Sequence, residues 1–121
     1  MDPIRAAVNA DPEWKLAARY WNAAIRLEAG DHCYSLRVDD GRLTAFQPAD
    51  PLDSFTIEIS ASAEIWREML QAMPRPFHQC FFAAQLGGTG LRMGGDMESI
   101  YAHYGALARL LAIMRTHLNL H

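Results

Sequence analysis

The spacing of apolar residues changes near Ala24, and this change constrains the fold more than any other feature. From Trp14 to Ala24, apolar residues recur every three or four positions, which predicts an amphipathic helix with one buried face. From Ile25 to Val38, apolar and polar residues alternate, as in strands that bury one face. A chain that combines both periods predicts an α+β fold in which helices cover a sheet.

Turn signals divide the rest of the alternating region into strands. Asp40-Gly41 predicts a hairpin, and the chain returns as a strand from Leu43 to Phe46. The prolines within 47–54 predict a loop, because proline cannot donate a hydrogen bond to a neighbouring strand. A further strand follows, and the residues expected on its buried face are Phe55, Ile57 and Ile59.

Helix starts are marked by side chains that can cap an N-terminus. Asp2 and Asp11 each precede a proline that suits the first helical turn. Ser60 and Ser62 precede a helix that is expected to run to the Pro-Arg-Pro string at 74–76, and a short helix is expected over 77–86. Asp96 is expected to cap a single last helix, whose apolar stripe comprises Met97, Ile100, Tyr104, Leu107, Leu111, Met114 and Leu118.

The glycine-rich stretch at 87–95 lacks the chemistry of a nucleotide-binding loop. A Walker loop requires Lys and then Ser or Thr after its last glycine, whereas Gly95 is followed by Asp96 and Met97. A dinucleotide fingerprint fails as well, because these glycines follow a predicted helix and Asp96 would repel a phosphate. The stretch instead predicts a short strand over 91–93 and a tight turn into the last helix.

Length, charge and cysteine content exclude several classes of protein. The 121 residues predict a single domain spanning 1–121. Fourteen acidic and 11 basic side chains without a basic block argue against nucleic-acid binding. Cys33 and Cys80 form no CxxC motif and no signal-peptide pattern is present, so a reduced, cytoplasmic setting is expected. No apolar run reaches the roughly 18 residues of a transmembrane helix.

Five histidines and two cysteines leave an enzymatic alternative open. His78 and Cys80 would point about 200° apart on one helix, which argues against a local catalytic pair. The motifs HExxH and GxSxG are absent, so we expect no catalytic residue, no metal and no cofactor. The alternative is a small hydrolase or isomerase that uses a pocket His with an Asp. His103 is the candidate histidine for such a site.

Three strings and their order resemble the sterol carrier protein type two family. The strings are VDDGRL at Val38–Leu43, FTIEISASAEIWREML at Phe55–Leu70 and LRMGGD at Leu91–Asp96. The resemblance covers the chain from about Trp21 to Leu111, and the order and spacing of elements carry it because the family has no catalytic signature. It implies a five-stranded, mostly antiparallel sheet covered by helices, with an apolar tunnel between sheet and helices.

The resemblance also implies that the tunnel holds a fatty acyl chain, a sterol or a similar lipid. The protein would then be a carrier, or a domain that presents substrate to a lipid-handling enzyme. Apolar side chains on the predicted helices could line the tunnel, and each could equally be ordinary core. A further alternative is an interaction module that forms a homodimer through the last helix. The expected ligand-binding residues are Trp66, Met69, Leu70, Met73, Phe77, Phe81, Phe82, Tyr101, Tyr104, Leu107 and Leu111.

Overall fold

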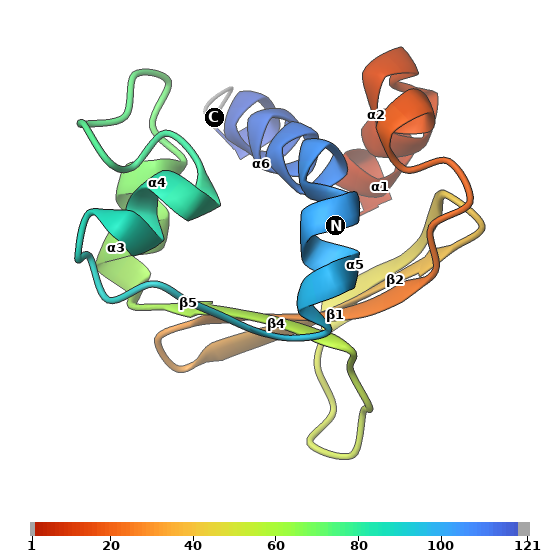
Figure 1. Ribbon diagram of the computed structural model, residues 1–121, viewed down its shortest axis with the longest axis horizontal. Helices are drawn as coiled ribbons and strands as arrows, with labels where there is room; N and C mark the ends of the chain where they lie inside the picture. Colours follow the sequence, from red (N-terminus) through yellow and green to blue (C-terminus); the bar gives the residue numbers. More distant parts are fainter. Residues whose placement is uncertain (1, 119–121) are drawn as a thin grey trace.

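The computed structural model describes residues 2–118, which form a five-stranded sheet with the helices gathered on one of its faces (Figure 1). This arrangement confirms the predicted α+β class. The elements in chain order are α1 (Asp2–Ala10), α2 (Pro12–Ala17), β1 (Ala23–Ala29), β2 (His32–Asp39), β3 (Arg42–Pro48), β4 (Ile57–Ala61), α3 (Ala63–Met69), α4 (Phe81–Leu86), β5 (Arg92–Gly95), α5 (Met97–Ala102) and α6 (Tyr104–Leu118).

The sheet has the strand order β3-β2-β1-β4-β5 and is mostly antiparallel. Only the central pair of described strands, β1 and β4, runs parallel. Asp40 and Gly41 form the predicted hairpin between β2 and β3, with φ values of 47° and 80° that a two-residue Asp-Gly turn favours. The 49–56 loop projects from the sheet on the side opposite the helices (Figure 1).

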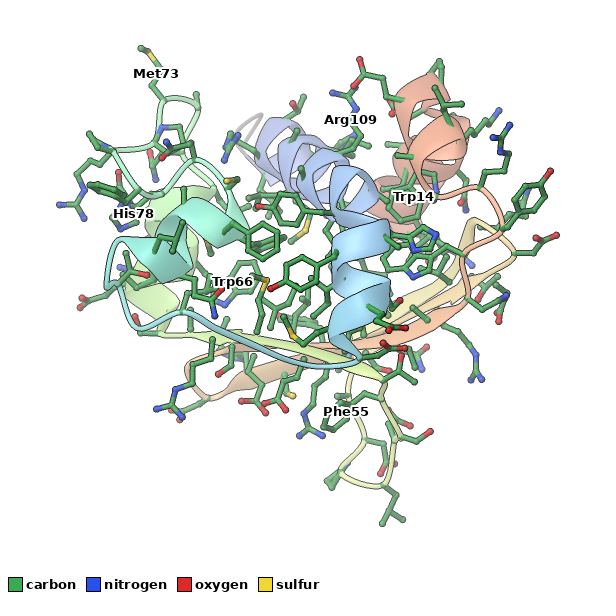
Figure 2. The ribbon with its side chains drawn as sticks, in the orientation of Figure 1. Trp14, Phe55, Trp66, Met73, His78 and Arg109 are labelled. Atoms are coloured by element: carbon green, nitrogen blue, oxygen red, sulfur yellow. The ribbon has the colours of Figure 1, made fainter. Side chains whose placement is uncertain are left out.

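Alternation along the strands separates a buried face from a polar one. Ile25, Leu36 and Ile57 point toward the helices and are almost fully buried, as predicted. Phe55 is an exception to the prediction. It precedes β4, is 41% exposed and lies on the outer side of the sheet, where the Arg26 guanidinium is 5.4 Å from its ring centroid (Figure 2). Because Phe55 belongs to the 49–56 loop and not to β4, the alternation of the strand does not determine which way its side chain points.

The helix predicted from Pro12 is shorter than its apolar pattern. Asp11 caps α2 as predicted, but the helix ends at Ala17 and the chain turns through Tyr20, whose φ is 66°. Trp14 and Trp21 are nevertheless both buried, with ring centroids 6.1 Å apart. Their indole nitrogens donate to the carbonyl oxygen of Gly41 at 2.9 Å and the hydroxyl of Ser99 at 2.8 Å, respectively.

The two helices beside the Pro-Arg-Pro string are also shorter than predicted. Ser62 caps α3, whereas Ser60 lies within β4. Helix α3 ends at Met69, before the prolines, and α4 begins only at Phe81, with Cys80 as its cap. Phe77 has a φ of 67°, which is incompatible with the helix predicted over 77–86.

The prediction of one continuous last helix is wrong. Asp96 caps its start as predicted, with its carboxylate accepting from the Ser99 amide at 3.2 Å. The helix breaks at His103 into α5 and α6, and the His103 ring stacks on Trp21 at 4.9 Å. The glycines at 94–95 belong to β5 rather than to a turn after it. Among residues 2–118, no helix is long and apolar enough to span a bilayer.

Candidate functional site

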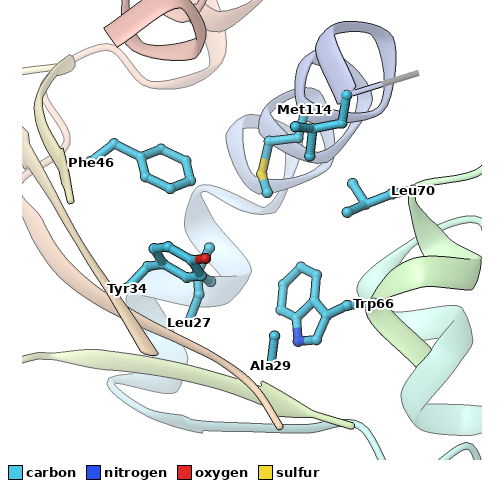
Figure 3. Close-up of a pocket in the computed structure, with 8 residues that line it drawn as sticks. Leu27, Ala29, Tyr34, Phe46, Trp66, Leu70 and Met114 are labelled. Carbon is cyan, nitrogen blue, oxygen red and sulfur yellow. The ribbon is translucent and has the colours of Figure 1, made fainter. Parts of the chain in front are cut away.

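An apolar pocket lies between the sheet, α3 and α6 (Figure 3). The sheet contributes side chains from β1, β2 and β3, and one helix lies on each side of them. The pocket has a volume of about 160 Å³, and none of its described lining residues is charged. These residues are Leu27, Ala29, Tyr34, Phe46, Trp66, Leu70, Met114 and Leu118.

Trp66 forms the α3 side of the pocket and is fixed by its contacts. Its indole nitrogen donates to the carbonyl oxygen of Glu28 at 2.7 Å, which ties α3 to β1. Its ring meets Phe81 edge to face, with centroids 5.8 Å apart. Because the indole N–H is already bonded, Trp66 presents an apolar surface to the pocket.

Tyr34 and Phe46 form the sheet side of the pocket. Their rings lie edge to face at 6.1 Å, and the Tyr34 hydroxyl points into the space between the lining residues (Figure 3). Within residues 2–118, no side chain or backbone group hydrogen-bonds to this hydroxyl. The pocket therefore combines apolar walls with one hydroxyl group.

Arg115 links α6 to the connection between α3 and α4. Its Nε donates to the carbonyl oxygen of Met69 at 2.9 Å, and a terminal nitrogen donates to that of Gln79 at 3.2 Å. Burial lowers the pKa of the Arg115 guanidinium below its usual value, although arginine stays protonated in proteins. The guanidinium thus holds the 70–79 connection beside the pocket.

The structure distributes the predicted ligand-binding residues over four environments: the pocket, an aromatic stack, the core and the surface. Trp66 and Leu70 line the pocket. Phe82 and Tyr104 are half-buried and stack on each other, with ring centroids 4.0 Å apart. The Tyr104 hydroxyl accepts from the Phe82 amide at 2.9 Å, and burial raises its pKa. Residues in the third group are buried in the core outside the pocket lining, and they are Met69, Phe81, Leu107 and Leu111.

Three predicted residues lie at the surface instead of inside a tunnel. Met73 is 90% exposed because α3 ends before it, and Phe77 is 55% exposed in the same connection. Tyr101 is 65% exposed and contacts the edge of the aromatic stack at Phe82, 5.6 Å away. These side chains do not lie inside the fold as expected. Helix α3 ends before Met73, α4 begins after Phe77, and Tyr101 lies on the exposed side of α5.

Sequence reasoning missed most of the lining. The alternation of Leu27, Ala29 and Tyr34 with polar residues predicts that they lie on the buried face of strands, but it does not indicate a ligand contact. Met114 and Leu118 belong to the predicted apolar stripe of the last helix, and helical periodicity alone does not distinguish pocket lining from core. Much of that stripe packs within this chain, with Leu107 and Leu111 almost fully buried, whereas Leu118 is 40% exposed.

The residues of the enzymatic alternative do not meet in the pocket. His103 lies against Trp21, away from the lining, and its buried Nδ1 has no hydrogen-bond partner among the described residues. His78 and Cys80 precede α4, so the expectation that they share a helix is wrong. Over residues 2–118, no group of three or more His, Cys, Asp or Glu side chains is placed to hold a metal.

Two larger hollows near α1 and α2 differ in chemistry from this pocket. Their volumes are about 450 and 320 Å³, and Asn9 and Arg42 line both of them. Charged side chains such as Arg5, Lys15 and Arg19 complete their walls. A polar, charged lining does not suit an apolar ligand.

Solved structures match this architecture, whereas no family model and no curated protein matches the chain. The crystal structure of sterol carrier protein 2 aligns with a TM-score of 0.76 over 94% of this chain and 92% of that chain, at 17% identity. The chain has a sterol carrier protein 2-like fold. This finding confirms the fold expected from the three sequence strings.

Two further structures share the sterol carrier protein 2-like fold. One is a conserved hypothetical protein from Thermus thermophilus, described as a candidate sterol carrier protein, with a TM-score of 0.71 and 17% identity over 93% of this chain and 82% of that chain. The other is UbiJ-SCP2, a ubiquinone synthesis protein, with a TM-score of 0.59 and 16% identity over 91% of this chain and 90% of that chain. At such identities the similarity establishes the fold.

Proposed function

We propose that the protein binds a hydrophobic ligand between the sheet, α3 and α6, as a lipid carrier or as a domain that presents a lipid to an enzyme. The observation that carries this proposal is the uncharged, partly aromatic pocket in a sterol carrier protein 2-like fold. The neighbour named as a ubiquinone synthesis protein supports the presenting role and a lipid-handling enzyme as partner. Among the described lining residues, the Tyr34 hydroxyl is the one nucleophilic group and none is charged, so the proposal is binding rather than catalysis.

The pocket must widen to hold a whole lipid tail. Its volume of about 160 Å³ is below the roughly 300 to 1,000 Å³ of small-molecule sites. Leu118 is 40% exposed, so the pocket reaches the surface beside α6. Opposite it, the 70–79 connection is held by the two hydrogen bonds of Arg115. We place the opening here, with α3 and α4 moving away from α6.

Burial of a tail provides enough free energy for such an opening. Sixteen methylenes at about 0.8 kcal/mol each provide about 13 kcal/mol. Association and tail ordering cost about 4 to 6 kcal/mol, and breaking two hydrogen bonds costs about 2 kcal/mol more. About 6 kcal/mol remains, which corresponds to a Kd of roughly tens of micromolar.

A titration with the neutral fluorescent probe Nile red tests the proposal. Ala29 lines the pocket, so Ala29→Leu fills part of it and is expected to weaken probe binding at least tenfold. Ala45→Leu is the matched control, because Ala45 pairs with exposed Arg37 on the outer face, and it should stay within about twofold. Native mass spectrometry of fresh protein should show a retained lipid. Absence of any probe binding, or equal loss in both variants, contradicts the proposal.

A further inference from the structure

We propose that the ligand is an uncharged lipid with one polar group, a hydroxyl, carbonyl or ester, which hydrogen-bonds to the Tyr34 hydroxyl. This inference rests on the proposed function and names the ligand class for the same pocket. It differs from a free fatty acid or a phospholipid, whose headgroups are charged. The polar groups of the pocket, the position of Tyr34 and the placement of nearby cations support this ligand class.

The lining has very few polar side-chain atoms. Of its eight described residues, Trp66 and Tyr34 alone carry one, and the others are aliphatic or aromatic hydrocarbons and a thioether. The Trp66 nitrogen is bonded to the carbonyl oxygen of Glu28. The Tyr34 hydroxyl is left to meet a ligand, and it can both donate and accept a hydrogen bond.

The Tyr34 ring is held in place before a ligand arrives. Tyr34 lies in β2, where it pairs with Leu27 of β1 on one side and Pro48 of β3 on the other. Phe46 contacts the ring edge to face at 6.1 Å. Because strand and ring are fixed on both sides, little conformational entropy is lost when the hydroxyl binds a partner.

No described residue that lines the pocket carries a positive charge for a carboxylate. Arg115 is the cation on α6 beside the pocket-lining Met114, and its guanidinium is engaged by the carbonyl oxygens of Met69 and Gln79. A carboxylate at Tyr34 would lose its hydration for one hydrogen bond, which does not offset the cost of burying a charge. If the carboxylate instead stays in water outside the pocket, the Tyr34 hydroxyl has no hydrogen-bond partner on the ligand. In either orientation, an uncharged polar group binds better.

Competition against Nile red with sixteen-carbon ligands presented from cyclodextrin tests this inference. At pH 8, 1-hexadecanol is expected to compete at least tenfold better than palmitate. Tyr34→Phe keeps the ring and removes the hydroxyl. It should therefore weaken the binding of 1-hexadecanol about five- to tenfold and leave the affinity for hexadecane unchanged. Tyr20→Phe, at an exposed tyrosine outside the pocket, is the matched control and should change neither ligand.

The possible outcomes separate this inference from the proposed function. One contrary outcome is that hexadecane and Nile red bind while palmitate binds as tightly as 1-hexadecanol. Another is that they bind while Tyr34→Phe leaves the affinity for 1-hexadecanol unchanged. Either result shows that the ligand class is wrong but that the pocket binds apolar ligands. If palmitate binds more tightly at pH 8, a cation at the pocket entrance holds the ligand and the inference is overturned. If no ligand of the series binds, both proposals fail.

Discussion

The two flanks of the helical layer are held by different kinds of contact. On the α1–α2 flank, two tryptophans are fully buried and both indole nitrogens are bonded. Asp11 of this flank accepts two hydrogen bonds from Arg109 of α6, at 2.9 and 2.7 Å (Figure 2). On the α3–α4 flank, Met73 and Phe77 are exposed, and Arg115 donates to the backbone carbonyl oxygens of Met69 and Gln79.

This difference shows where the fold can open. Helix α6 is common to both flanks, so the helix itself does not decide which flank moves. Separating α2 from α6 would expose the buried Trp14 and break the Asp11–Arg109 pair. Separating α3 from α6 would expose Trp66 and Met69, but beside a pocket that is already partly open to the surface. We therefore propose that the α1–α2 flank is the rigid frame and that a ligand enters through the α3–α4 flank.

The largest expected effect is on the rigid flank. Trp14→Ala removes a fully buried indole and should lower the free energy of unfolding by about 3 to 5 kcal/mol, measured by urea denaturation. Met73→Ala on the other flank removes an exposed side chain and should change it by less than about 0.5 kcal/mol. Similar losses in the two variants would remove the contrast between the flanks.

Asp11→Ala should have the next largest effect, about 2 kcal/mol in the same assay. The carboxylate both caps α2 and pairs with Arg109, and the substitution removes both interactions. Asp11→Asn keeps a capping oxygen and should recover about half of the loss. If Asn is as damaging as Ala, the charge pair rather than the cap accounts for the whole effect.

The Asp11 pair also predicts a pH dependence. Hydrogen bonds from Arg109 lower the pKa of Asp11 from 3.8 to about 2. A lowered carboxyl pKa stabilises the fold above pH 3.8, and this contribution is lost as the pH falls through about 2. The difference in unfolding free energy between the natural protein and Asp11→Asn should therefore shrink between pH 4 and pH 2. A difference that stays constant over this range would contradict the ion pair.

Asp96→Ala should cost about 1 kcal/mol, since the carboxylate caps α5 through the Ser99 amide. Asp96→Asn should leave the free energy of unfolding nearly unchanged, because a cap requires only an acceptor oxygen. Thermal unfolding of both variants gives the comparison. Retained stability together with lost ligand binding in Asn would indicate a chemical role for Asp96 instead.

Arg115→Met should lower the free energy of unfolding by no more than about 1 kcal/mol, because the freed carbonyl of exposed Gln79 can be hydrated while that of buried Met69 loses its partner. Its local effect should be larger. Amide hydrogen exchange over 70–80 is expected to accelerate, and Nile red should associate faster. Arg67→Met, at an exposed arginine of α3, is the control and should change neither rate. Unchanged exchange in Arg115→Met would show that Arg115 does not hold this flank.

Local sequence signals predicted the parts of the fold that depend on neighbouring residues. The Asp40-Gly41 turn and the caps at Asp11 and Asp96 are examples, since each requires only a side chain and the backbone next to it. The break at His103 was not predicted, because apolar periodicity continues through it. Stacking of His103 on Trp21, distant in sequence, accompanies the break.

The pocket was predicted less well than the fold for the same reason. Alternation identifies Tyr34 and Phe46 as residues near the core but does not tell which helix covers them. Helical periodicity also extended α3 to Met73, whereas the helix ends at Met69. The identity of a lining depends on where helices end and which strand they cross, and these are properties of the assembled fold.

Amide hydrogen exchange with and without saturating 1-hexadecanol tests the central claim most directly. We predict slower exchange in α3, α4 and the 70–79 connection when the lipid is bound, because its tail packs against this flank and Arg115 closes over it. Exchange in α2 should be the same in both states, since the rigid flank does not take part. Bound lipid with slower exchange confined to α1 and α2, or with no change anywhere, would contradict the account.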